Sequence, residues 1–193
     1  ILIVGCSDSK IKSQDKKVLL IKQLDKDYQK QKHFFKNEFI SHFPKKLDTT
    51  YITFTNSESP DLGSLTLRLT NKYYNKTRIN KIIDNSITHY ASNDSCLLIV
   101  NRFATSDRFY KIQPSKEEKE IIDKECYNDK LPIPNFWNSQ INSETTDTKL
   151  PEDFMIYVLD AKKGNFMQRD LLTDGRSMPI DWKHGYSKGI ALS

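Results

Sequence analysis

The residues best suited to chemistry lie close together near the end of the chain, in the stretch DWKHGYSKG (181–189). An imidazole, a carboxylate, a phenol and an amine occur there within eight residues. An imidazole acts as a general acid or base near neutral pH, a carboxylate orients it, and a phenol or amine polarises a substrate oxygen. The stretch therefore predicts a hydrolase site formed by His184, Asp181, Tyr186 and Lys188.

A second interpretation of this stretch is structural. Gly185 and Gly189 would give the backbone freedom for a turn before a terminal strand, and Trp182 would cover the core. The chain contains no P-loop, Gly-x-Ser-x-Gly, His-Glu-x-x-His, Cys-x-x-Cys or calcium-loop pattern. We therefore expect neither a metal nor a cofactor, and the sequence leaves open whether the protein is an enzyme.

Two proline-containing stretches each lead to a tryptophan, LPIPNFW (131–137) and MPIDW (178–182). Rigid loops that present Trp137 and Trp182 predict an aromatic platform for a carbohydrate ring or an extended peptide. The alternative is that each tryptophan packs onto the core as a lid.

The chain opens ILIVGCSDSK, in which Ile3-Val4-Gly5-Cys6 resembles the lipobox of bacterial lipoprotein signal peptides. The resemblance implies a lipid on Cys6, with residues 1–5 as the remnant of a signal peptide and 6–16 as a polar tether. Residues 17–193 would then form a single domain, which we expect to be truncated at its C-terminus. The alternative is a cytosolic α/β domain in which residues 1–5 form a core strand.

The cysteine count agrees with export, because an acylated Cys6 leaves one pair, Cys96 and Cys126. Paired cysteines are typical of oxidising compartments. A disulfide between these two closes a loop of about 30 residues and contributes on the order of 3 kcal/mol to stability. The alternative is two buried thiols, which are common in protein cores.

The charge pattern bears on partners. The net charge is +5, carried by 24 lysines and only six arginines. Proteins that bind nucleic acids specifically use arginine for bidentate contacts with bases and phosphates, so we expect no nucleic-acid partner. Scattered lysines are typical of a solvated surface, with at most weak attraction to anionic membranes or polysaccharides.

The remaining patterns predict an α+β fold, with helices packed on one face of a mostly antiparallel sheet. Apolar periodicity indicates helices over 15–43 and 77–91, and a capping box at 115–118 begins another helix, to about 127. Strands are expected at 49–55 and 64–70, which can pair as a hairpin, at 96–103 and at 154–163.

The tail from LPED (150–153) onward is also similar to an uncharacterised group of small bacterial proteins, a resemblance that implies no activity. We therefore predict a membrane-anchored lipoprotein of the cell envelope that binds a protein or glycan ligand. An envelope hydrolase working through Asp181, His184 and Tyr186 is the alternative function.

Overall fold

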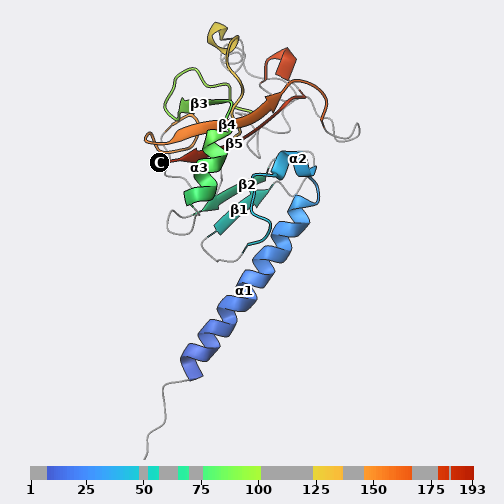
Figure 1. Cartoon of the computed structure of the whole chain (residues 1–193), viewed down its shortest axis with the longest axis vertical. Helices are drawn as coiled ribbons and strands as arrows, with labels where there is room; N and C mark the ends of the chain where they lie inside the picture. The colour runs from blue at the N-terminus through green and yellow to red at the C-terminus, as the bar shows by residue number, and fades with distance from the viewer. Residues whose placement is uncertain are drawn as a thin grey trace, which may run out of the picture. The chain divides into compact units, whose positions relative to one another are not determined.

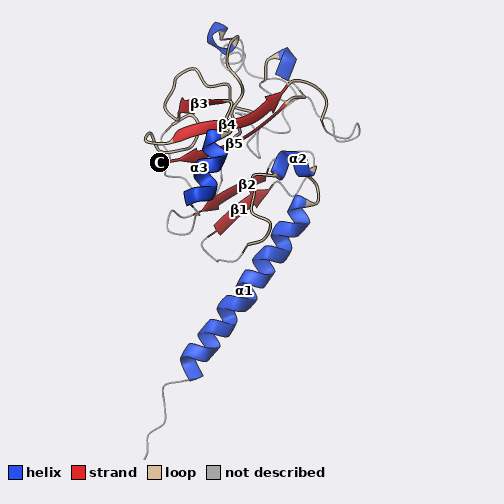
Figure 2. Cartoon of the chain, viewed as in Figure 1, coloured by secondary structure: helices blue, strands red, loops and turns tan. Residues whose placement is uncertain are grey.

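The fold was analysed in a computed structural model of the chain, which describes residues 8–47, 52–56, 65–69, 76–100, 124–136, 146–166, 178–182 and 184–193. The chain divides into two compact units, where the sequence predicts one domain. The first comprises residues 1–58 and 65–75, and the second residues 59–64 and 76–193. Helices and antiparallel strands occur together, so the α+β class is confirmed (Figure 2). The packing of helices on one face stays a prediction.

The first unit contains a long helix, a short helix and a β-hairpin (Figure 1). The expected helix over 15–43 is instead two, because α1 (Asp8–Lys32) ends in a turn before α2 (Asn37–Ile40). Helix α1 also covers most of the expected tether at 6–16. Strands β1 (Ile52–Asn56) and β2 (Leu65–Leu69) pair antiparallel, which confirms the predicted hairpin.

The C-terminal half of α1 is fixed to the chain that follows it. Tyr28 is fully buried with Leu47, and its hydroxyl donates to the carbonyl of Pro44 at 2.8 Å. The backbone N–H of Leu47 donates to Asp25 Oδ1 at 2.6 Å. Partly buried side chains complete this cluster: Leu24, Phe43, Leu65 and Leu67. Burial therefore holds the second half of the helix, whereas residues 15–20 are exposed.

The second unit is built on a three-stranded antiparallel sheet in the order β3-β4-β5. Its strands are β3 (Thr88–Ala91), β4 (Met155–Lys162) and β5 (Tyr186–Leu192). Strand β4 confirms the strand predicted at 154–163. Two short 3-10 helices, η3 (Glu125–Tyr127) and η4 (Ile180–Trp182), lie outside the sheet.

The predicted helix over 77–91 is wrong in its second half. Helix α3 (Lys76–Asp84) ends where the Asn85 side chain donates to the carbonyl of Lys81, and residues 88–91 form the edge strand β3. β-Branched and aromatic residues suit a half-buried strand, and Thr88 and Tyr90 are of these types. His89 is therefore a strand residue and not a helix-terminal one.

The core of this unit lies under β4. Its buried members are Leu97, Ile99, Ile133, Ile156 and Val158. Residues 96–100 form no regular strand, contrary to the expectation for 96–103, of which 101–103 lie outside the described residues. Ile99 instead makes an isolated parallel bridge with Ile133.

Gly189 allows β5 to lie close to its neighbours. A Cβ at this position would lie 2.5 Å from the carbonyl oxygen of Tyr157 and 3.4 Å from the ring of Pro134. Gly189 pairs with Val158, so this close contact lies at the centre of the β4–β5 pairing. The sheet therefore requires glycine here.

We expect Gly189→Ala to lower the free energy of unfolding by about 1–3 kcal/mol, because the added methyl group meets a backbone carbonyl that cannot move independently of β4. Urea unfolding followed by circular dichroism measures the change. An unfolding midpoint equal to that of the native chain would contradict this account of the β4–β5 contact.

Candidate functional site

A break in the β4–β5 register decides where Asp160 points. The pairing runs Ile156 with Ala191 and Val158 with Gly189, then shifts so that Asp160 pairs with Lys188. Strand side chains alternate between faces, so uninterrupted pairing would place Asp160 on the same face as the buried Ile156 and Val158. The irregularity adds one residue, as a β-bulge does, and such features redirect side chains next to functional sites.

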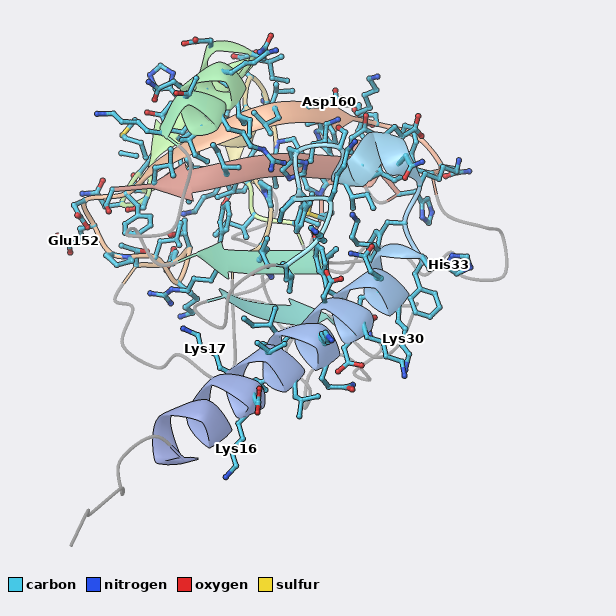
Figure 3. The ribbon with its side chains drawn as sticks, turned by 60° about the horizontal axis from the view of Figure 1, so that its bottom comes forward. Lys16, Lys17, Lys30, His33, Glu152 and Asp160 are labelled. Carbon is cyan, nitrogen blue, oxygen red and sulfur yellow. A yellow bond between two sulfur atoms is a disulfide. The ribbon has the colours of Figure 1, made fainter. Side chains whose placement is uncertain are left out.

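The redirected carboxylate is the centre of a polar cluster on β4 and β5. Figure 3 labels Asp160 on β4. Tyr186 donates its hydroxyl to Asp160 Oδ2 at 2.5 Å. The ammonium groups of Lys162 and Lys188 lie 3.7 and 3.9 Å from the same oxygen. Asp160 and Lys188 are 27% and 19% exposed, so this part of the cluster is shielded from water but still reachable.

An aromatic ring borders this Asp160 cluster. Phe166 meets Tyr186 edge to face, with ring centroids 4.6 Å apart. Asp160 makes all three of these contacts through Oδ2, and within the described residues none is made by Oδ1. A carboxylate oxygen, two ammonium groups and an aromatic pair side by side suit hydrogen bonding and stacking with a polar ligand.

The predicted site around His184 is divided between two neighbourhoods. Tyr186 and Lys188 belong to the Asp160 cluster, whereas Asp181 pairs with Lys163 Nζ at 2.8 Å on an exposed surface. His184 lies half-buried in the turn before β5. The interaction that the structure gives Asp181 is thus with a lysine. The catalytic roles that the hydrolase hypothesis gives to Asp181 and His184 stay predictions.

The two tryptophans of the predicted platform have different outcomes. Trp182 packs against the cluster of Leu98, Tyr127 and Met178, and Lys163 Nζ lies 5.5 Å from the centre of its ring. This is the lid arrangement that was the alternative for a loop tryptophan. Trp137 lies outside the described residues, so the platform stays a prediction.

The predicted Cys96–Cys126 disulfide is present in the structure. The two Cα atoms are 6.1 Å apart, and the bond joins the residue before the buried Leu97 to η3. Next along η3, the Tyr127 side chain is buried in the cluster with Leu98. The disulfide therefore anchors η3 beside the core. Cys6, the predicted lipid attachment point, lies outside the described residues.

An ion pair between Asp94 and Lys130 joins the same two parts of the chain as the disulfide. Asp94 accepts the backbone N–H of Cys96 at 2.7 Å through Oδ1 and the ammonium group of Lys130 at 3.0 Å through Oδ2. Lys130 also lies over the ring of Tyr90, whose hydroxyl accepts the backbone N–H of Leu131. The hydrogen bond from Cys96 lowers the pKa of Asp94, burial partly opposes this, and Lys130 lowers the pKa further.

The described residues contain no group of three or more histidine, cysteine, aspartate or glutamate residues able to hold a metal ion. Within the same residues, no helix is both long and apolar enough to span a membrane.

Comparisons with protein-family models, with curated proteins and with solved structures each gave no match. Function is therefore argued from the residues of this chain alone.

We expect Asp94→Asn to be less stable than the native chain at pH 7 by about 1 kcal/mol, because the charge-assisted bond to Lys130 is lost. A lowered pKa in the folded state contributes stability above the ordinary value of 3.8. That contribution is lost as the pH falls through the folded-state pKa, so the two proteins should converge in acid. Urea unfolding between pH 7 and pH 2 measures the difference.

Asp153→Asn is the control for this pH series, since it removes the same charge from an exposed carboxylate. Its stability should follow that of the native chain throughout. A difference between Asp94→Asn and native protein that is the same at every pH would contradict the role given to the ionised carboxylate.

Proposed function

We propose that the chain is a cell-envelope lipoprotein, attached to a membrane through Cys6, and that its folded part is a ligand-binding module. The observation that carries the proposal is the Cys96–Cys126 disulfide. The chain has three cysteines, so this pairing makes Cys6 the remaining candidate for acylation. Structural disulfides persist in oxidising compartments, which supports export.

Helix α1 supports the same proposal by its position. It begins at Asp8, directly after the lipobox-like residues, and extends for 25 residues. At 1.5 Å per residue its length is about 37 Å. Residues 15–20 are all exposed, and burial begins at Ile21. A helix in this position connects a lipid on Cys6 to the fold that packs on Tyr28.

The attachment is tested by mass spectrometry of the N-terminal peptide, after expression of the gene with its own upstream sequence in a bacterial host. We expect Cys6 to be the mature N-terminus and to carry a diacylglyceryl group, because lipobox cleavage precedes the cysteine. Cys6→Ser should release the protein from the membrane fraction. A native protein with an unmodified Cys6 would overturn the proposed anchor.

For the ligand, we propose a glycan bound at the Asp160 cluster. Sugar hydroxyl groups donate to carboxylates and accept from ammonium groups, and sugar rings pack on aromatic side chains. Asp160, Lys188 and the Phe166–Tyr186 pair bring these three features together on one side of β4 and β5. The hydrolase alternative has less support, because Asp181 and Tyr186 have different partners.

Glycan binding is tested with a panel of purified bacterial polysaccharides and peptidoglycan fragments, using biolayer interferometry. We expect at least one to bind the native chain, and Asp160→Ala to weaken that binding about tenfold or more, since a hydrogen bond to a charged group is removed. Asp153→Ala, at an exposed position before β4, is the matched control and should bind as the native chain does. Equal binding by Asp160→Ala, or no binding to any glycan, would contradict this ligand.

A further inference from the structure

Most of the net charge of the chain lies on α1. The helix contains eight lysines and four aspartates, a net charge of +4, against +5 for the whole chain. It contains no arginine. The charge is therefore concentrated on the element that directly follows the proposed lipid attachment point.

The lysines of α1 gather on the side away from the hairpin. At 3.6 residues per turn, Leu19 lies opposite the buried Tyr28, and four lysines lie within about a third of the circumference centred on Leu19. We call this set the basic face: Lys16, Leu19, Lys22, Lys26 and Lys30. Each of its members is exposed. Figure 3 shows Lys16 and Lys30 projecting from the same side of α1, and Lys17 from the other side.

The aspartates of α1 neutralise only part of the positive charge on the basic face. Asp25 is turned toward the core, where it accepts the N–H of Leu47 and a bond from Gln29. Asp27 accepts both bonds of the Gln23 amide and lies 4.0 Å from Lys30. Asp15 is exposed within the arc of the basic face and offsets one of its four lysine charges. Among the residues that the structure describes, Lys30 is the lysine of this face that lies within 4.0 Å of a carboxylate, and Lys16, Lys22 and Lys26 form no ion pair.

Apolar side chains accompany these lysines. Leu19 is 64% exposed, and its neighbours Val18 and Leu20 are 47% and 52% exposed. Leu19 lies at the centre of the basic face, where its exposed side chain can enter the headgroup region of a bilayer. Successive residues of a helix point about 100° apart, so Val18 and Leu20 lie at the two flanks of this face.

We propose that the basic face of α1 binds an anionic phospholipid surface. The complementary charge identifies the partner, since juxtamembrane lysines contribute about 1 kcal/mol each near anionic lipid. Lysine is a hydrated point charge that suits diffuse attraction to headgroups, whereas nucleic acids favour arginine forks. The orientation rests on the proposed anchor at Cys6, which would hold the start of α1 at the same membrane. The contact itself requires no acyl chain.

The test uses the full chain carrying Cys6→Ser, so that no lipid is attached, and vesicles of phosphatidylcholine with about 30% phosphatidylglycerol. We expect binding to these vesicles and not to pure phosphatidylcholine, and weaker binding as salt rises, because ionic screening shortens the range of the attraction. Replacing Lys16, Lys22, Lys26 and Lys30 with glutamine should weaken binding about 1000-fold. Leu19→Ser should weaken it several-fold.

The matched control replaces four exposed lysines outside α1 with glutamine, so the total charge change is the same: Lys36, Lys76, Lys81 and Lys124. This variant should keep vesicle binding close to native. Circular dichroism verifies that each variant is folded. A loss below about tenfold in the α1 variant, or an equal loss in the control, overturns the proposal.

A duplex DNA of the same total charge distinguishes the membrane from polyanions in general. Binding to the duplex as tight as to the vesicles, with the same dependence on the four lysines, would overturn the assignment to lipid. The chain in this test has no acyl group, so a negative vesicle-binding result does not bear on the proposed lipid anchor. The anchor is tested separately by mass spectrometry of the peptide that contains Cys6.

Discussion

The segment from Lys130 to Pro134 is the constraint on which the second unit depends. Ile133 is fully buried, and its backbone donates to Leu98 and accepts from Val100 at 2.8 and 3.1 Å. Buried backbone groups must be paired, so these two bonds allow an irregular segment to lie inside the core. In the same segment, the carbonyl oxygen of Pro132 accepts a hydrogen bond from the Ser187 hydroxyl, and the ring of Pro134 lies beside Gly189. It thereby fixes β5, which carries half of the Asp160 cluster.

Local sequence patterns predict much of the fold. The predictions that are wrong concern segments whose structure is decided by pairing with distant parts of the chain. The hairpin at β1 and β2, strand β4 and the pairing of Cys96 with Cys126 are all expected from alternation and cysteine count. The helix expected to reach residue 91 ends at Asp84, and Thr88–Ala91 instead pair with β4, a partner more than 60 residues away that local periodicity cannot reveal. Likewise, residues 96–100 are as apolar as a central strand, but only Ile99 bridges to a neighbour.

The sequence predicts the β5 residues of the candidate site but not their partner on β4. Tyr186 and Lys188 stand out as chemically able residues in a glycine-bracketed stretch. Their partner Asp160 is 26 residues away from Tyr186, at a place where strict alternation would direct its carboxylate into the core. The register shift that redirects it depends on pairing between two strands, which neither strand specifies alone. Asp181 and Tyr186 are only five positions apart in the sequence, but they have different partners in the structure, Lys163 and Asp160.

The contacts that join residues 94–99 to residues 126–133 differ in how they respond to a change of redox conditions. They are a disulfide, an ion pair and a backbone bridge. The disulfide joins positions 30 apart in the sequence, and it keeps them together even in the unfolded chain. Reduction removes this covalent constraint and leaves the ion pair and the bridge to hold η3 beside the core.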